Sequence, residues 1–411
     1  MDVYYPQSIP CPNQLSKELR LIDVKIDFSR RCLRCGLPET YETLEFDEAG
    51  VCNICRSSEF KRDNINWAER RDLLSNIIEK NRGKYEYDCI VPFSGGKDST
   101  FTLLYLIKEF KIKPLVVRFN HGFYRPKVLS NSNKTLRKLG VDFLEFTPNW
   151  HIVKQLMRES FDRKTDFCWH CHCGIYSYPL RVALMYKVPL VFWGEPQSEI
   201  THYYDYVNDQ IESEDWERFN KIRNLGINSA DMYEMLKSRG ISIEERQLLP
   251  YSFPDESSLK EIGYLSVPLG SFIPWNYQAN SELIKKELSW EVDELEGVPI
   301  SLNSHGEKIE CFMQGTRDYI KFLKRGYGRS MQISAFKARS GEISQPQAVA
   351  NSLENDGKIP PSLDLFLNYV GLSIEEFHEI VEESVITPWT TEKWPTETSK
   401  QLDDFDQWFR E

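Results

Sequence analysis

The sequence lacks the features that mark several common classes of protein. No window approaches the roughly 18 consecutive apolar residues of a membrane-spanning helix, and the longest apolar run, Val188–Trp193, is far too short. Residues 1–15 contain neither the basic stretch nor the apolar stretch of a secretory leader, so we expect a cytoplasmic protein. Basic residues are not in excess: 51 Lys and Arg stand against 62 Asp and Glu, giving a net charge of −11. This balance argues against binding to nucleic acid through bulk electrostatics.

The sequence also has no internal repeat and no low-complexity run. Its composition, 41% hydrophobic and 27% charged, is ordinary for a globular protein and excludes wholesale disorder. A length of 411 residues predicts two or three domains.

Cysteine is the exception to this ordinary composition, with ten residues in the chain. Four of them form two C-x-x-C pairs, Cys32/Cys35 and Cys52/Cys55, separated by sixteen residues. This is the spacing of a zinc site in which each pair sits on a tight turn. Buried or disulfide-bonded cysteines that pair by chance are the alternative. We interpret residues 30–56 as a structural zinc module, because four thiolates leave the metal no open position for chemistry.

After the zinc module the apolar pattern alternates between short strands and longer helices. Strands are expected at 87–92, 113–119, 141–146 and 188–193, and helices at 67–82, 101–110, 127–139 and 175–186. This alternation predicts an α/β fold, a parallel sheet with helices on both faces. From about residue 205 the pattern is mostly helical. We therefore predict three domains, with residues 1–60 carrying the zinc module, 61–205 the α/β core and 206–411 a mostly helical region.

A glycine-rich turn, Ser94–Ser99 (SGGKDS), follows the first expected strand. It is not a Walker A loop, because Val91 replaces the first glycine of that motif and Asp98 follows Lys97; the dinucleotide fingerprint G-x-G-x-x-G is also absent. Two adjacent glycines ahead of a helix nevertheless favour an anion, and Asp98 can orient a divalent metal beside phosphates. A plain strand–turn–helix link is the alternative. The predicted phosphate-binding residues are Ser94, Gly95, Gly96, Lys97, Asp98 and Ser99.

The SGGKDS segment resembles, at every position, the PP-loop of the N-type ATP pyrophosphatases. The flanking sequence extends the likeness through RCLRCGLPET…FDEAGVCNIC and YDCIVPFSGGKDS, and more weakly through FCWHCHCGI, FWGE, LGSFIPWNY and YIKFLKRGYGR. Over residues 30–380 the chain is similar to the N-acetyl sugar amidotransferases, bacterial enzymes that make acetamidino sugars for surface polysaccharides and flagellar glycans.

The resemblance implies an ATP-dependent reaction. The N-acetyl carbonyl of a nucleotide-linked sugar is adenylated with release of pyrophosphate, and ammonia then replaces AMP. The implied cofactors are ATP, Mg²⁺ and structural Zn²⁺, with Lys97 on the phosphates and Asp98 on the magnesium ion. A separate glutaminase subunit is the expected source of ammonia, because the sequence shows no persuasive glutaminase of its own. No membrane partner is expected, and nucleic acid is not the expected partner.

Further candidates follow from position in the expected sheet, whose strand ends line the ligand crevice. Gly194 and Glu195 close one strand and Arg118 ends another; we assign Glu195 to substrate or ammonia and Arg118 and Gly194 to ATP, with ordinary strand-end residues as the alternative. Four basic residues recur near helical spacing. We assign them to binding the diphosphate of the sugar nucleotide, with a solvent-exposed helix face as the alternative. This basic group consists of Lys321, Lys324, Arg325 and Arg329.

A second cysteine cluster, Cys168-Trp-His-Cys171-His-Cys173, is open to two interpretations. Cys168 and Cys171 either hold a second metal or cluster, or line the active site as reduced thiols. A tRNA thiolase using Cys168, Cys171 or Cys311 is therefore a rival to the amidotransferase, although the acidic balance counts against it. A non-catalytic nucleotide-binding scaffold is the third hypothesis. Three tryptophans of the C-terminal tail, Trp389, Trp394 and Trp408, either dock a partner or pack back on the domain.

Overall fold

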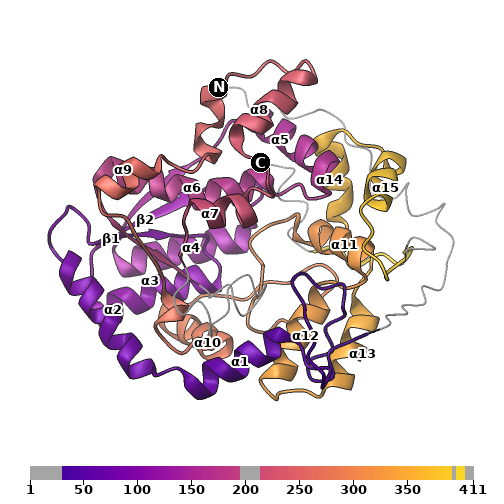
Figure 1. The fold of residues 1–411 in the computed structure, drawn as a ribbon, viewed down its shortest axis with the longest axis horizontal. Helices are drawn as coiled ribbons and strands as arrows, with labels where there is room; N and C mark the ends of the chain where they lie inside the picture. The colour runs from indigo at the N-terminus through magenta and orange to yellow at the C-terminus, as the bar shows by residue number, and fades with distance from the viewer. Residues whose placement is uncertain (1–29, 195–212, 391–394, 403–411) are drawn as a thin grey trace.

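The computed structural model describes residues 30–194, 213–390 and 395–402. At its centre lies a five-stranded parallel sheet in the order β3-β2-β1-β4-β5 (Figure 1). The strands are β1 (Cys89–Pro92), β2 (Pro114–Phe119), β3 (Asp142–Phe146), β4 (Leu190–Trp193) and β5 (Leu265–Pro268). The predicted α/β fold is therefore confirmed, and the four expected strands are all present.

The fifth strand, β5, was not expected, because it lies in the region predicted to be mostly helical. It pairs with β4 over all four of its residues, from Leu190 opposite Leu265 to Trp193 opposite Pro268. The sheet therefore extends beyond the predicted core of residues 61–205 into the C-terminal region. The domain boundaries themselves remain a prediction.

Helices cover both faces of the sheet, as expected for parallel strands that are buried on both sides. One face is covered by α2 (Trp67–Asn81), α3 (Lys97–Phe110), α4 (Pro126–Leu139) and α10 (Tyr277–Leu288). The other face is covered by α6 (Trp169–Tyr186), the π-helical turn η3 (Phe219–Arg223), α8 (Ser229–Ser238), the 3₁₀ turn η4 (Glu245–Tyr251) and α9 (Glu256–Glu261).

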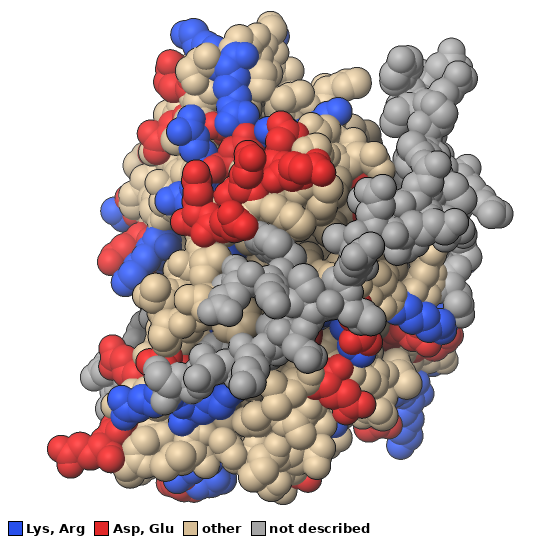
Figure 2. All heavy atoms as spheres, turned by 90° about the vertical axis from the view of Figure 1, so that its right-hand side faces the viewer, with Lys and Arg blue, Asp and Glu red and all other residues tan. Residues whose placement is uncertain are grey.

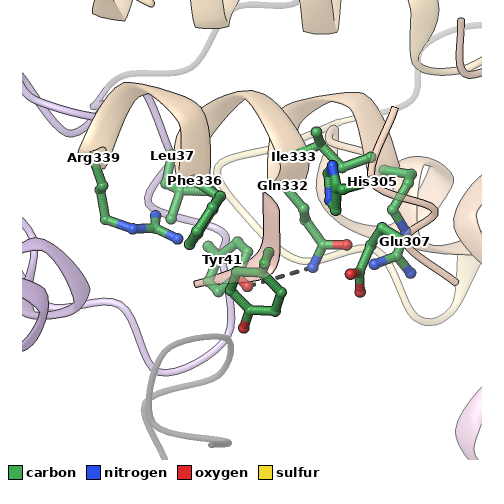
Figure 3. A pocket seen from close by; sticks show the side chains of 10 residues that line it. Leu37, Tyr41, His305, Glu307, Gln332, Ile333, Phe336 and Arg339 are labelled. Carbon is green, nitrogen blue, oxygen red and sulfur yellow. Dashed lines mark hydrogen bonds between the residues drawn. The ribbon is translucent and has the colours of Figure 1, made fainter. Parts of the chain in front are cut away.

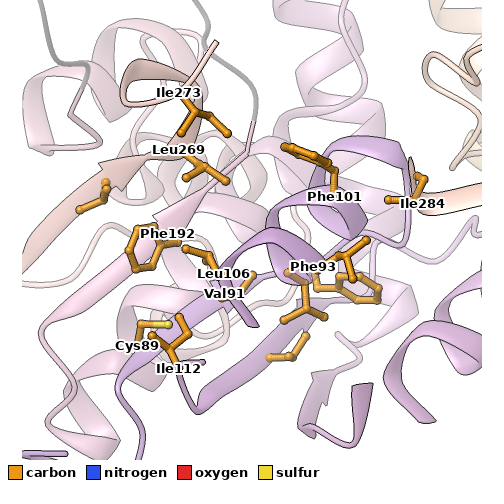
Figure 4. Close-up of a cluster of buried hydrophobic side chains, with 14 of the residues drawn as sticks. Cys89, Val91, Phe93, Phe101, Leu106, Ile112, Phe192, Leu269, Ile273 and Ile284 are labelled. Carbon is orange, nitrogen blue, oxygen red and sulfur yellow. The ribbon is translucent and has the colours of Figure 1, made fainter. Parts of the chain in front are cut away.

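Alternation along β1 divides the hydrophobic core into two layers. Cys89 and Val91 point into the first layer, where Phe101 of α3 and Ile284 of α10 join them (Figure 4). Ile90 points into the second layer, toward α6. Both layers are built from residues that are almost wholly buried, so the sheet is a rigid support for the loops at its strand ends.

Some helices differ from the expected ones in extent. The helix expected at 175–186 begins earlier, at Trp169, so that Cys168 precedes its first turn. Helix α5 (Trp150–Lys164) was missed; the Asn149 side chain caps it by accepting a hydrogen bond from the His151 amide at 3.0 Å. The polar stretch after the second cysteine pair is also helical, as α1 (Asn53–Asn64).

A second group of helices stands beside the sheet and carries the N-terminal module (Figure 1). Its members are α11 (Gln314–Arg325), α12 (Arg329–Arg339), α13 (Gln345–Asn355), α14 (Ser362–Val370) and α15 (Ile374–Glu382), while the short α7 (Trp216–Arg218) and η5 (Leu269–Ser271) lie in connecting segments. The four cysteines of the zinc module pack in one cluster with Met331, Ala335 and Ala348. The N-terminal module therefore rests on the C-terminal region. In the part of the chain described, no helix is both long and apolar enough to cross a membrane.

Candidate active site

The glycine-rich turn lies where the strand order changes direction. From β1 the chain first builds β2 and β3 on one side and later β4 and β5 on the other, so the ends of β1 and β4 diverge. Ligands of open α/β sheets bind at such a switch point. The predicted loop follows β1 directly, and Gly194, which ends β4, lies against it: a Cβ added at Gly194 would be 3.5 Å from the Cβ of Asp98. The structure thus brings two of the predicted elements together.

Two serines close the loop from within. The Ser99 hydroxyl oxygen accepts hydrogen bonds from the amides of Ser94 and Gly95, each at 3.2 Å, and the Ser94 hydroxyl oxygen accepts one from the Gly96 amide at 3.2 Å. Trp290 fixes the loop from outside by donating its indole N–H to the Gly95 carbonyl at 3.1 Å. These contacts give the serines a role in shaping the loop, in addition to the phosphate contact that the sequence predicts.

Both glycines of the loop are required by their surroundings. Gly95 has a φ of +83°, and a Cβ added there would overlap the Ser132 hydroxyl. A Cβ at Gly96 would overlap the Glu310 carboxylate, which lies directly against the loop. Gly96 is also the N-cap of α3, so the first turn of a fourteen-residue helix begins at the point where an anion would approach.

Lys97 is held by carboxylates from two separate parts of the chain. Its side chain is only 2% exposed, and its Nζ lies 2.5 Å from Asp98 Oδ2 and 2.6 Å from Glu307 Oε2. The ammonium also stands 4.6 Å from the centre of the Tyr277 ring. Burial opposes ionisation of Glu307, but the surrounding positive charges, of which the Lys97 ammonium is the strongest, together outweigh it and hold the pKa of that carboxyl well below its usual range. Lys97 is thus a charged, buried cation beside the loop, balanced by acidic groups that phosphates can replace.

Arg118 lies beneath the loop, almost fully buried. Its guanidinium donates to Glu145 at 3.1 Å and to the Ser132 hydroxyl, the same hydroxyl that borders Gly95. Arg118 therefore supports the loop in this structure, and its predicted contact with ATP stays a prediction. Glu195 falls outside the described residues.

A pocket opens beside Lys97, between the zinc module and the C-terminal helices. Arg339 lies at one end and His305 and Glu307 at the other, with Tyr41 and Gln332 between them (Figure 3). Burial, reinforced by the charge of Lys97, lowers the pKa of His305 to about 4, so this imidazole is neutral at neutral pH. The remaining lining residues are Leu37, Tyr277, Arg329, Ile333 and Phe336. The pocket offers hydrogen-bond donors and apolar walls next to the loop, as a site for a polar organic ligand requires.

The predicted basic group divides among three places. Arg329 lines the pocket and is bound by Asp318 through two hydrogen bonds of 3.2 and 2.9 Å. Lys321 donates to Gln332 of the same pocket at 3.3 Å, and burial lowers its pKa to about 8. Arg325 donates to the Thr40 carbonyl of the zinc module, and Lys324 to the Lys164 carbonyl. The expected single helix is interrupted, because α11 ends with Gly326 in the left-handed conformation and Arg329 begins α12.

The four N-terminal cysteines are arranged to hold one metal ion. Their ligand atoms all lie within 4.8 Å of one another, with Sγ–Sγ distances of 3.9 Å for Cys32–Cys55 and 3.8 Å for Cys35–Cys52. A zinc ion with four bonds of about 2.3 Å at tetrahedral angles places its sulfurs about 3.8 Å apart. The all-thiolate donor set and these distances therefore fit zinc, and the site is buried, as a structural site should be.

Several residues of the site were not found from the sequence. Tyr277, Trp290, His305, Glu307 and Glu310 all contact the loop or line its pocket. They follow the last residue of the loop by 178 residues or more and belong to segments with no motif of their own. Only LGSFIPWNY, which includes Tyr277, carried a signal, through the family resemblance.

Charge on the surface is mixed. On the face shown in Figure 2, Lys and Arg side chains of the described residues are interspersed with Asp and Glu. Acidic side chains gather on part of that face.

Comparison with known proteins agrees with this site. Residues 307–403 match the C-terminal domain of LPS biosynthesis proteins of the WbpG-like type, and the first residue of that match, Glu307, is the one paired with Lys97 of the loop. Residues 307–403 of this chain thus resemble the C-terminal domain of these LPS biosynthesis proteins. This match supports the resemblance to the N-acetyl sugar amidotransferases.

Further similarities also cover only parts of the chain. An uncharacterized protein of Methanocaldococcus jannaschii, MJ1599, is 29% identical over 126 residues, which are 31% of this chain and 43% of that protein. The match thus spans less than half of the relative's length. Among solved structures, the U34-tRNA thiolase NcsA from Methanococcus maripaludis, with its [4Fe-4S] cluster, is 14% identical with a TM-score of 0.25. The likeness covers 63% of this chain and 83% of NcsA, and a score this low supports no argument about function.

Proposed function

We propose that the protein is an ATP-dependent amidotransferase that converts the N-acetyl group of a nucleotide-linked sugar into an acetamidine, for lipopolysaccharide or a related glycan. The observation that carries the proposal is the contact between Lys97 and Glu307 at 2.6 Å. This contact links a PP-loop, a phosphate-binding turn suited to ATP, to a region that resembles a domain of LPS biosynthesis proteins.

The chemistry explains why ATP is needed. An amide carbonyl carbon is a poor electrophile, and its oxygen is not a leaving group. In the proposed first step the acetyl oxygen attacks the α-phosphorus of ATP, the bond to the β-phosphate oxygen breaks, and pyrophosphate leaves. In the second step ammonia adds to the activated carbon, loses a proton to solvent and expels AMP, which carries away the former acetyl oxygen.

The residues of the loop are suited to the first step. Charge grows on pyrophosphate as it leaves, and the N-terminus of α3 together with Lys97 can stabilise that charge. Lys97 would exchange its contact with Glu307 for one with a phosphate oxygen. A magnesium ion would supply further charge neutralisation, and the Asp98 carboxylate, 19% exposed beside the loop, is the residue that fits it.

The pocket beside Lys97 is suited to the sugar. Gln332, Tyr41 and the neutral His305 offer hydrogen bonds to hydroxyl groups, and Arg329 and Arg339 supply positive charge for a diphosphate. Because the pocket shares Glu307 with the loop, a sugar bound there lies next to the activated phosphate. Ammonia from a separate glutaminase remains part of the proposal.

The decisive test follows the acetyl oxygen. The protein is incubated with ATP, Mg²⁺, ammonium and a panel of N-acetylated nucleotide sugars whose acetyl oxygen carries a heavy isotope. We expect AMP to form only with the correct sugar, the heavy oxygen to appear in AMP, and mass spectrometry to show NH in place of oxygen in the sugar.

Two variants separate the two halves of the site. Asp98→Asn should abolish AMP formation, whereas Gln332→Leu should raise the KM for the sugar and leave the KM for ATP unchanged. Formation of AMP without label, or full turnover by Asp98→Asn, would contradict the proposal. Adding tRNA and a sulfur donor tests the rival thiolase reaction in the same assay.

A further inference from the structure

The fold brings Cys311 near Cys168 and Cys171 of the second cysteine cluster. Cys168 is the N-cap residue of α6, and Cys171 lies in its first turn. Cys311 is 140 residues further on, just before α11, yet its backbone forms an antiparallel bridge with Tyr124. The three side chains come from two segments far apart in the sequence, and the fold brings these segments together.

Several contacts hold the two segments against each other. The His170 ring nitrogen lies 3.4 Å from the His121 carbonyl, and the rings of His121 and Tyr124 are 3.9 Å apart. Because Tyr124 forms the bridge with Cys311, these contacts place the start of α6 beside Cys311. On the opposite side, Arg317 of α11 forms a 3.8 Å ion pair with Asp166, two residues before Cys168. Cys168 and Cys311 also pack against the same hydrophobic cluster.

The three thiols interact electrostatically and are reachable from solvent. Cys171 and Cys311 each raise the pKa of the Cys168 thiol, in addition to the larger effect of burial, and Cys311 does the same to Cys171. All three are only partly buried, unlike Cys89 and Cys173, which are fully enclosed. Glu310 also acts on Cys171, and its carboxylate lies against Gly96. The trio therefore stands next to the ATP loop, on the C-terminal side of the sheet.

The spacing of the trio distinguishes it from the zinc site. Among the described residues, only the four N-terminal cysteines bring their ligand atoms within 4.8 Å of one another. Cys168, Cys171 and Cys311 are thus spread more widely than one tetrahedral ion requires. An iron–sulfur cluster spaces its cysteine ligands further apart than a single ion does, because metal–metal and metal–sulfide distances separate them. Three soft thiolates and no carboxylate among them suit such a cluster.

We propose that Cys168, Cys171 and Cys311 bind a four-iron iron–sulfur cluster beside the PP-loop, with one iron lacking a protein thiolate. This site is separate from the amidotransferase chemistry proposed above and does not depend on it.

The test uses the full-length protein, purified without oxygen and treated with ferrous iron and sulfide. We expect about four iron atoms per chain, together with one zinc. Each of Cys168→Ser, Cys171→Ser and Cys311→Ser should lose most of the iron and keep the zinc. Cys173→Ala is the matched control: it lies on the same helix, is buried, and should keep both metals.

A Mössbauer spectrum of the wild type needs no variant and should show one iron site unlike the others. The proposal is overturned by zinc alone after reconstitution, by a disulfide within the trio, or by undiminished iron in Cys311→Ser. The amidotransferase proposal is judged separately. Bound iron without sugar-dependent formation of AMP would refute the amidotransferase function but not the cluster. Sugar-dependent formation of AMP without bound iron would refute the cluster alone. Sulfur transfer to tRNA by the iron-loaded protein would support the cluster and replace amidation with thiolation.

Discussion

Replacing Lys97 with methionine should damage stability and catalysis by different routes, which a second substitution can separate. Methionine keeps the length of the side chain but removes the charge. Glu307, 12% exposed, then loses the ammonium that lies 2.6 Å from it. Removing one partner of a buried ion pair costs about 3–5 kcal/mol. Because Glu307 keeps some contact with solvent, we expect the lower end, about 3 kcal/mol, or roughly a hundredfold in the folding equilibrium.

Most of this loss should return in the double variant Lys97→Met/Glu307→Gln, because the charge on Glu307, the more buried of the two carboxylates that Lys97 contacts, is then removed as well. We expect its free energy of unfolding to lie within about 1 kcal/mol of the wild type. Glu307→Gln alone should be mild, since Lys97 still has Asp98 at 2.5 Å. Formation of AMP should be lost in both variants that lack Lys97, because the cation itself is required.

Chemical denaturation at several pH values tests the electrostatic reasoning. In the wild type the pKa of Glu307 is lowered by folding, so its stabilisation is present above the ordinary glutamate pKa of 4.5 and is lost as the pH falls below that value. In Lys97→Met burial dominates and raises the pKa, so stability should increase as the pH falls from neutrality toward 4.5. A double variant as unstable as Lys97→Met, or an unchanged pH slope, would refute this account.

Three further predictions concern the loop and the zinc module. Gly95→Ala should abolish ATP turnover and lower the free energy of unfolding by at least about 1–2 kcal/mol, because φ is +83° and the added Cβ meets a neighbour. Gly140→Ala, where φ is +63° and the added Cβ meets open space, is the control in calorimetry. Cys52→Ser should lose the single zinc and lower the melting temperature, and zinc affinity of the wild type should fall with pH as thiolates protonate, both measurable by metal analysis and thermal melts. Glu310 holds a carboxylate against Gly96 of the loop, so Glu310→Gln should bind ATP more tightly near neutral pH. Because burial raises the pKa of Glu310, this difference in affinity should shrink in acid as the wild-type carboxyl protonates. Weaker ATP binding by the variant in titration calorimetry would contradict a repulsive role.

The features predicted correctly are those that a short stretch of sequence determines. The loop needs only two glycines between a strand and a helix, and the zinc site needs two close cysteine pairs. The strand runs were recognisable because parallel strands are buried on both faces, as the six buried residues of β2 show. Each of these signals is complete within about thirty residues, so no knowledge of the fold was needed.

The features that were missed depend on contacts between distant segments. The strand β5 has only four residues, and its strand character is set by pairing with β4, 75 residues earlier. Glu307 is recognisable as part of the site only when Lys97, 210 positions before it, lies 2.6 Å away. The four basic residues do not share one helix face, because α11 ends at Arg325, with Gly326 as its C-cap, and Arg329 belongs to the next helix. Trp389 packs against the C-terminal helices and donates its indole N–H to the Leu323 carbonyl at 2.9 Å. Trp394 and Trp408 lie outside the described residues.

The segment between α10 and α11 determines how the C-terminal region takes part in the site. It contains no regular helix or strand, and Lys308 has a φ of +53°, so successive side chains leave it in different directions. Within seven residues His305 lines the pocket, Glu307 pairs with Lys97, Glu310 covers Gly96 and Cys311 joins the thiol trio. A phosphate arriving at the loop brings negative charge beside two of these carboxylates, which must then change partners or bind a cation. We therefore expect occupancy of the loop to affect the pocket and the thiols, because all three are bounded by the same short piece of chain.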